Sequence, residues 1–177
     1  MSLLSGCADS AKDACFKQFK KADRTHTIFS DKKFVKDFKE HYLPELDSNC
    51  NDGDKESCLF IGILYNDAWF VDTWHLEKVP KFCLKDPTKY YEKATNMTDM
   101  KKWHGKYFNY NNAFIRFMGY YALRSYRVPN YNDINATKSL KYFKKEIVIA
   151  KKYCEISGDC VRYEQYIKDL KKLEKRQ

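Results

Sequence analysis

Long apolar runs are missing from this chain of 177 residues. No stretch approaches the roughly 18 consecutive apolar residues that make a transmembrane helix, so we predict none. Glycine and proline are scarce, with six and four residues, whereas an all-β fold needs these residues at its many tight turns. The sequence therefore favours helices over a sheet-based architecture.

Common catalytic and metal-binding motifs are missing too. The chain contains no G-x-S-x-G, no H-E-x-x-H and no phosphate-binding loop. Its seven cysteines form no C-x2-C or C-x4-C pair of the zinc-binding kind, and no C-x-x-C redox pair. The four histidines lack ligand spacing: His26, His41, His75 and His104. We therefore expect no metal, no cofactor and no catalytic activity.

Positive charge and aromatic side chains are in excess. Lysine and arginine number 33 against 24 aspartates and glutamates, a net charge of +9, and 16% of the residues are aromatic. The charge fits either an ordinary lysine-rich surface or a basic face that meets an anionic surface or partner. The aromatic residues recur at the spacing of helix cores, which is typical of packing rather than base stacking, so we expect no nucleic-acid partner.

The cysteines are spaced as disulfide pairs. Cys7–Cys15 and Cys50–Cys58 both read C-x7-C, and Cys154–Cys160 reads C-x5-C. Paired, regular spacing is typical of disulfides formed in an oxidising compartment. We predict the bonds Cys50–Cys58 and Cys154–Cys160.

The segment Leu4–Cys7, "LSGC", has the form of a lipobox, whose cysteine becomes acylated. The residues before it are too few for a signal peptide, so a lipobox here would belong to a shortened precursor; a chance match is the alternative. An acylated Cys7 would tether the protein to a membrane and leave Cys15 and Cys83 to form a long-range bond. Otherwise Cys7 should bond Cys15 and leave Cys83 unpaired.

Helical periodicity covers most of the chain, and no segment alternates with the period of two that marks strands. We predict an all-α fold with helices over 15–22, 31–46, 54–65, 86–95, 111–126, 135–154 and 158–175. Asp54 and Asp86 are placed to cap the helices that follow them, and Pro44 should fray the helix that contains it. The expected core positions include Phe34, Phe38, Tyr42, Leu46, Leu140, Phe143, Ile147, Ala150, Val161, Ile167, Leu170 and Leu173.

Two parts of the chain resemble each other. "SCLFIGILY" (57–65) aligns with "FIRFMGYYA" (114–122) so that Gly62 matches Gly119, and "TKYYEKA" (88–94) resembles "LKYFKKE" (140–146). The repeated unit is a helix with a central glycine, a loop and a second helix. The glycine would let two helices approach closely, and repeats at this spacing predict a helical solenoid.

This pattern resembles the Sel-1-like repeats, which are related to the tetratricopeptide repeat. It appears as "IGILY" with "YYEKAT", and more loosely as "MGYYA" with "YFKKE". "CNDGDKESCLFIGILY" (50–65) is similar to the junction between repeats in the Helicobacter cysteine-rich protein subgroup. The resemblance covers about residues 48–165. The family's alanine- and glycine-rich units are eroded here, and the central connection is longer than the family's.

The resemblance implies one domain over 15–173, between an N-terminal segment 1–14 and a basic tail 174–177. Its fold would be an α/α solenoid of antiparallel helix pairs, with disulfides clamping successive repeats. It implies a monomeric protein of the periplasm or outer membrane, otherwise secreted, that binds a protein or peptide as an adaptor. The alternative is the penicillin-binding or weak β-lactam- or cell-wall-hydrolysing activity reported for some cysteine-rich relatives.

The segment 66–86 is the most individual part of the sequence. It joins two predicted helices by about twenty residues, where two to eight are usual. It either folds over an end of the solenoid and supplements the core, or binds a partner through its aromatic side chains. We expect a partner-binding site made of Trp69, Phe70, Trp74, His75 and Phe82, with Trp103 and Tyr107 from a second aromatic cluster at 101–112.

Asn135 lies in "DINAT" (133–137), which is similar to the extended N-glycosylation sequon of some epsilon-proteobacteria. We expect Asn135 either to carry a glycan or to mark the start of a helix, close to the cap position.

Overall fold

The backbone of the computed structural model is helical over the residues that it describes, which are 10–23, 28–73, 76–96, 102–126 and 135–174. Within these ranges it forms no β-strand, and one isolated bridge joins His104 and Asn109. The prediction of an all-α fold is therefore confirmed. The chain separates into two compact units, unit 1 over 1–94 and unit 2 over 95–177. Each unit is described by itself.

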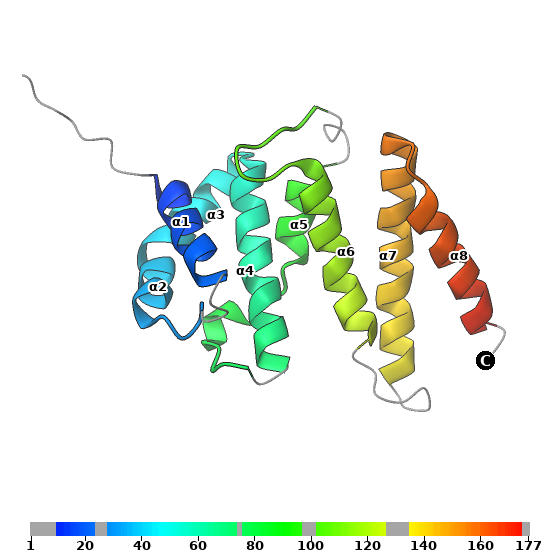
Figure 1. Ribbon diagram of the computed structural model, residues 1–177, viewed down its shortest axis with the longest axis horizontal. Coiled ribbons are helices and arrows are strands. Elements are labelled where there is room, and N and C mark those ends of the chain that lie inside the picture. Colours follow the sequence, from blue (N-terminus) through cyan, green and yellow to red (C-terminus); the bar gives the residue numbers. More distant parts are fainter. Residues whose placement is uncertain (1–9, 24–27, 74–75, 97–101, 127–134, 175–177) are drawn as a thin grey trace, which may run out of the picture. The chain divides into compact units, whose positions relative to one another are not determined.

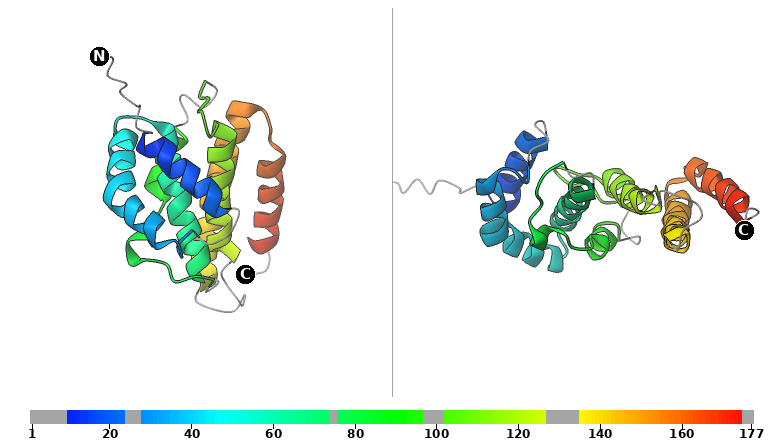
Figure 2. Two further views of the ribbon diagram at one scale, coloured as in Figure 1. Left: turned by 60° about the vertical axis from the view of Figure 1, so that its left-hand side comes forward. Right: turned by 90° about the horizontal axis from the view of Figure 1, so that it is seen from below.

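Unit 1 is built around one long helix. Its elements are α1 (Ala11–Asp23), α2 (Lys32–Asp37), the π-helical turn η1 (Phe38–Tyr42), α3 (Leu43–Asn51), α4 (Lys55–Thr73), the 3-10 turn η2 (Lys81–Cys83) and α5 (Thr88–Ala94) (Figure 1). Helix α4 packs against both α3 and α5, and α1 packs against α3 (Figure 2). Phe16 and Phe19 of α1 both meet the ring of Phe60 on α4, at centroid distances of 5.9 and 5.3 Å. The core of unit 1 therefore surrounds α4.

The helix around Pro44 continues instead of fraying. Asp31 caps α2 by accepting from the N–H groups of Lys33 and Phe34, both at 3.0 Å. The chain then passes through η1, where the N–H of Leu43 donates to the carbonyl of Phe38 five residues back. Pro44 follows this π turn directly, and the wider turn gives its ring the room that an α-helical turn lacks. The wider π turn is the physical reason why the expectation at Pro44 was wrong.

The long connection after α4 is shorter than we predicted. Residues 66–73 are the last two turns of α4, and the connection runs from 74 to 87. Asn66 and Asp67 have weak helix propensity, but propensity gives way to packing. Here Asn66 and Ala68 are buried, and their burial carries the helix past the polar pair.

The glycine of α4 sits where α5 comes closest. A Cβ on Gly62 would lie 2.9 Å from Cε1 of the Tyr91 ring, and the Tyr91 side chain is fully buried. No ordinary side chain fits at that distance, so the close approach predicted for this glycine is confirmed. The matching residue, Gly119, has no atom within 4 Å of its Cβ position. For Gly119 the prediction was wrong, because no neighbouring side chain crosses its helix at that point.

The described part of unit 2 contains three helices, α6 (Tyr110–Tyr126), α7 (Asn135–Ser157) and α8 (Val161–Glu174) (Figure 1). Helix α7 packs against both α6 and α8. Rings join α7 to α6, with Phe114 stacked on Tyr153 at 4.0 Å, and Phe143 meets Tyr166 of α8 at 5.6 Å. Val161 is 74% exposed. Its expected place in the core was wrong, because it starts α8 on the solvent side.

Each unit contains one disulfide among its described residues. Cys50 at the end of α3 bonds Cys58 in the first turn of α4, with Cα atoms 4.7 Å apart. Cys154 in α7 bonds Cys160, just before α8, with Cα atoms 4.4 Å apart. Both predicted pairs are confirmed in the structure. Each bond closes the turn between two consecutive helices, which removes entropy from the unfolded chain and is worth roughly 2–3 kcal/mol.

The first testable prediction concerns the two glycines. We expect Gly62→Ala to lower the free energy of unfolding by about 1–2 kcal/mol, because overpacking costs more than the helix propensity gained. Gly119→Ala is the matched control and should raise it by up to about 1 kcal/mol, since it adds helix propensity in open space. Urea unfolding followed by circular dichroism measures both. Shifts of the same sign would contradict the close-approach explanation.

The second prediction concerns Glu146, a buried carboxyl of α7. Burial raises its pKa, although a hydrogen bond with Tyr166 and the charge of Arg162 pull the pKa down. A raised folded pKa contributes stability that is complete below the ordinary value of 4.5 and is lost as the pH rises through the folded pKa. We expect Glu146→Gln to melt higher than the unaltered protein at neutral pH, by a margin that shrinks toward pH 4.5. Differential scanning calorimetry at several pH values between 4.5 and 7 measures the margin, and a margin that does not change with pH would contradict the role of the Glu146 charge.

Candidate binding site at the end of helix α4

Trp69 lies on the last turns of α4 and fixes the chain that returns to α5. Its side chain is half-buried, and its indole N–H donates to the carbonyl of Lys85 at 3.1 Å. Further along, the carboxylate of Asp86 accepts from the N–H of Thr88 at 2.9 Å and starts α5. Asp86 therefore caps this helix as predicted, and Trp69 holds the segment just before it.

The 76–86 segment folds back and contributes to the core of unit 1. Val79 and Cys83 are buried. Phe82 is half-buried and stacks on Phe38 of η1 at 6.4 Å, with the ammonium of Lys39 5.8 Å from its ring centre. Of the two alternatives for this segment, the packing of Phe82 fits the one in which its aromatic side chains supplement the core.

Two apolar side chains at the end of α4 face solvent. Phe70 is 40% exposed and Leu76 is 62% exposed, and they are the exposed large hydrophobic residues of unit 1 in the part of the chain that the structure describes. The N–H of Leu76 donates to the carbonyl of Val71 at 3.1 Å, so Leu76 returns beside the residue that follows Phe70. We call Phe70 and Leu76 the α4-end patch.

Acidic residues outnumber basic ones in the stretch of chain that carries the α4-end patch. Asp67, Asp72 and Glu77 lie there together with one exposed lysine, Lys78, and the last turn of α4 contains no basic residue. The C-terminal end of a helix also carries a partial negative charge. Glu77 accepts a hydrogen bond from the hydroxyl of Ser30 at 2.7 Å, which joins this stretch to the turn before α2. The patch is therefore apolar and belongs to a stretch of the chain with net negative charge.

The other predicted binding residues lie either outside the described residues or in unit 2. Trp74 and His75 lie outside the described residues. Trp103 and Tyr107 are half-buried and belong to unit 2, where the ammonium of Lys106 lies 4.9 Å from the Tyr107 ring centre. The binding role of all these residues stays a prediction.

A second group of polar side chains lies inside unit 1. The hydroxyl of Tyr90 donates to the Asp47 carboxylate at 2.9 Å, and the Tyr65 ring lies 5.6 Å from that of Tyr90. Burial first, then the charges of Cys83 and Asp47, raises the pKa of Tyr65 to about 12. Burial likewise raises the pKa of the Cys83 thiol to about 12, although Lys85 lowers it slightly. These groups therefore stay neutral at physiological pH and suit a structural role better than a nucleophilic one.

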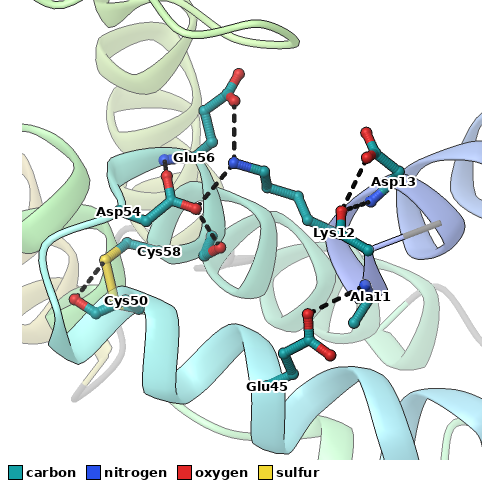
Figure 3. Close-up of polar contacts among 10 residues, drawn as sticks. Ala11, Lys12, Asp13, Glu45, Cys50, Asp54, Glu56 and Cys58 are labelled. Carbon is teal, nitrogen blue, oxygen red and sulfur yellow. Dashed lines mark hydrogen bonds and ion pairs between the residues drawn. A yellow bond between two sulfur atoms is a disulfide. The ribbon is translucent and has the colours of Figure 1, made fainter. Parts of the chain in front are cut away.

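The turn between α3 and α4 joins three helices through one aspartate (Figure 3). Asp54 accepts from the N–H of Glu56 at 3.2 Å and the hydroxyl of Ser57 at 2.7 Å, which confirms it as the cap of α4. It also pairs with Lys12 of α1 at 2.9 Å, and Lys12 reaches the buried Glu56 at 3.5 Å. Burial opposes the charge of Asp54, but hydrogen bonds from Ser57 and Lys12 outweigh it and lower its pKa.

One motif was missed when the sequence was read. Ser30-Asp31-Lys32-Lys33 has the S-x-x-K spacing found in β-lactam-binding enzymes, whereas the S-D-N and K-T-G motifs that accompany it there are missing from the sequence. Ser30 and Lys33 are both exposed, and no contact joins them. The Ser30 hydroxyl is bonded to Glu77 instead. A search for the spacing alone would have found the motif, but the geometry does not make it a catalytic site.

The remaining cysteines are not bonded to each other. Cys15 and Cys83 are both free and buried, so the long-range bond between them is not formed. Cys7 lies outside the described residues, and its acylation and its bond to Cys15 stay predictions. Asn135 is the first residue of α7, the place that the helix-start alternative expected, and its glycosylation also stays a prediction.

Neither a metal centre nor a membrane span is found in the described ranges. No three His, Cys, Asp or Glu side chains there are grouped so that they could hold a metal ion. No helix there combines the length and apolar character needed to cross a bilayer. Comparison of the chain with models of known protein families, with curated proteins and with solved structures finds no match.

A third prediction follows from the buried thiols. Burial raises the pKa of Cys15, as it does that of Cys83, so about one Cys83 thiol in ten thousand is ionised at pH 8. We expect both cysteines to resist iodoacetamide in the folded protein at pH 8 and to react fully in guanidinium, as read by peptide mass spectrometry. The stability that Cys83 contributes is complete below its ordinary pKa of 9.0 and is lost as the pH rises toward 12. Rapid alkylation of Cys83 in the folded protein would instead identify it as a reactive thiol.

Proposed function

We propose that the protein is an exported, non-enzymatic binding module whose α4-end patch engages a protein or peptide partner of the cell envelope. The observation that carries the proposal is the grouping of Phe70 and Leu76 at one place, on the surface of an otherwise well-covered unit. Exposed apolar side chains at the end of a helix and on the segment that follows it can concentrate contact energy at an interface. Trp69 and Phe82 hold that segment through their contacts with Lys85 and Phe38.

The scaffold that we propose is a degenerate helical-repeat solenoid of the Sel-1-like kind. Helices α4 and α5 meet at Gly62 as a repeat pair would. In unit 2, Phe114 contacts Tyr153 and Tyr121 contacts Tyr142, so the contacts run in opposite directions along α6 and α7, as they do between antiparallel neighbours. The two disulfides lie at helix turns, as the resemblance implies. These features support the repeat architecture.

Export is supported by the same disulfides. Two bonded pairs in one short chain are typical of an oxidising compartment and rare in the reducing cytosol. We place the protein in the periplasm or at the outer membrane, with secretion as the alternative destination. An acyl chain on Cys7 would tether it there.

The charge of the stretch that carries the patch indicates the chemistry of the partner. Asp72 and Glu77 lie close to the patch residues in the sequence, and the one basic residue between 66 and 80 is Lys78, so the stretch has a net negative charge and the last turn of α4 contains no basic residue. The best fit is a segment with one or two apolar anchors beside lysine or arginine. Charge of this kind chiefly sets the rate and specificity of binding, whereas the apolar anchors supply the affinity.

The fourth prediction tests this site with point variants. Deletion of 66–86 would remove two turns of α4 together with the buried Ala68, so single exposed side chains are the better probes. A photo-crosslinking residue at position 70 or 76 should give a discrete adduct in envelope extracts of the native cells. The same residue at position 115, where Ile115 of unit 2 is 50% exposed, is the matched control and should give none.

Affinity for the captured partner provides the second measurement. Phe70→Ser and Leu76→Ser should each weaken binding by about thirtyfold, the equivalent of about 2 kcal/mol, and Leu76→Ser, at the more exposed of the two positions, should leave the melting temperature nearly unchanged. Trp69→Ala should lower the melting temperature, since its indole bond to Lys85 holds the loop. Binding unaffected by both serine variants would overturn the site, and turnover of nitrocefin by the pure protein would favour the hydrolase alternative.

A further inference from the structure

The excess of positive over negative charge in the protein lies in one of its two units. Residues 1–94 contain 15 lysines and arginines against 16 aspartates and glutamates, whereas residues 95–177 contain 18 against 8. Unit 1 therefore has a formal charge of −1, and unit 2 has a formal charge of +10. A lysine-rich surface of the ordinary kind would spread the excess over both units, so the division calls for a separate explanation.

Much of this charge forms a stripe along the solvent-facing side of α7. Five exposed lysines share that side: Lys141, Lys144, Lys145, Lys151 and Lys152. At about 100° of turn per residue they fall within an arc of about 120°, and from first to last they extend about 16 Å along the helix. We call these five residues the α7 stripe.

The α7 stripe has an apolar centre and little opposing charge. Val148, 55% exposed, lies in the middle of its arc. The exposed acidic residue of this face is Glu155, 3.8 Å from Lys151 at the end of the stripe. The other carboxyl of the helix, Glu146, is buried on the opposite side. The face is therefore basic, with one aliphatic side chain that can enter the interface of whatever it meets.

We propose that the α7 stripe binds the surface of a bilayer that contains anionic phospholipid. Clustered lysines on one face of a helix are attracted by the negative potential of such a surface, and an aliphatic side chain among them adds a shallow apolar contact. This surface lies in unit 2 and does not depend on the α4-end patch. Its failure and the failure of the protein-binding site are therefore separate results.

Nucleic acid is the less favoured occupant. Single strands are bound by basic grooves in which exposed aromatic side chains stack with the bases. The aromatic residues of α7 turn inward instead, where Tyr142, Phe143 and Tyr153 contact Tyr121, Tyr166 and Phe114. The disulfide in the same unit also indicates a compartment in which nucleic acid is rarely met.

The test is partitioning of the whole purified protein onto vesicles. We expect it to bind vesicles of phosphatidylglycerol mixed with phosphatidylcholine at low salt, to be released at high salt, and to ignore vesicles of phosphatidylcholine alone. Each lysine at such a surface contributes about fivefold in affinity. Lys144→Gln combined with Lys152→Gln should therefore weaken partitioning by about 30-fold. Both side chains are exposed, so the melting temperature should not change.

The matched control removes the same charge elsewhere. Lys32→Gln combined with Lys33→Gln alters two exposed lysines of α2 in unit 1, and should change partitioning by less than about twofold, because these lysines lie outside the α7 stripe, in the unit that has no excess of positive charge. In addition, Val148→Trp should give a tryptophan emission that shifts to the blue on vesicles, as a ring at the interface does. If both double variants lose partitioning equally, the net charge of the protein drives binding and the assignment to the α7 stripe is wrong. Tighter binding to duplex DNA than to vesicles at equal salt would overturn the lipid assignment.

Discussion

The turn between α3 and α4 is the constraint on which unit 1 depends. Gly53 adopts φ +99°, a conformation that favours glycine, and so lets the chain reverse within a few residues. Cys50–Cys58 closes the turn covalently, and Asp54 both caps α4 and receives Lys12 from α1. Three helices thus meet at this turn, where the Asp54 carboxylate accepts hydrogen bonds from several donors. Since this turn fixes the start of α4, it also fixes where Gly62 meets Tyr91 and where Phe70 reaches solvent, two and four turns further on.

Local periodicity and cap chemistry predicted the helices, and long-range packing decided their ends. The four-residue spacing of Phe34, Phe38, Tyr42 and Leu46 identified a helix face. Phe34, Phe38 and Leu46 are buried and Tyr42 is half-buried. The continuation through Pro44 could not be foreseen, since it depends on one extra residue in the turn before it. The extension of α4 past Asn66 was equally hidden, because the neighbours that bury Ala68 come from elsewhere in the chain. Boundaries of this kind follow from tertiary contacts and not from the residues at the boundary.

The candidate site was predictable in its location but not in the roles of its residues. The unusual length and aromatic content of 66–86 pointed to this segment. Whether each aromatic side chain faces the core or solvent depends on the extra turns of α4, which place Trp69 against the returning chain and Phe70 outside. The packing of Phe82 could not be predicted from its own segment, because the ring on which it stacks, Phe38, lies more than forty residues away in the sequence. The net charge of the whole sequence did not reveal the α7 stripe. The excess of lysine and arginine in unit 2 becomes visible only when the charges of the two units are counted separately.

The two proposed surfaces lie on different units, and these units differ in net charge. Unit 1 is nearly neutral and displays an apolar patch in a stretch of net negative charge, which suits a basic protein segment and would be repelled by an anionic bilayer. Unit 2 is strongly basic and displays the opposite preference. A single acyl chain holds a protein to a membrane only marginally, and stable attachment needs a second signal such as a basic patch. If Cys7 is acylated, the α7 stripe supplies that second signal. The tether and the stripe would then act on the same membrane, and the α4-end patch would stay available for a partner because its charge keeps it from the lipid surface.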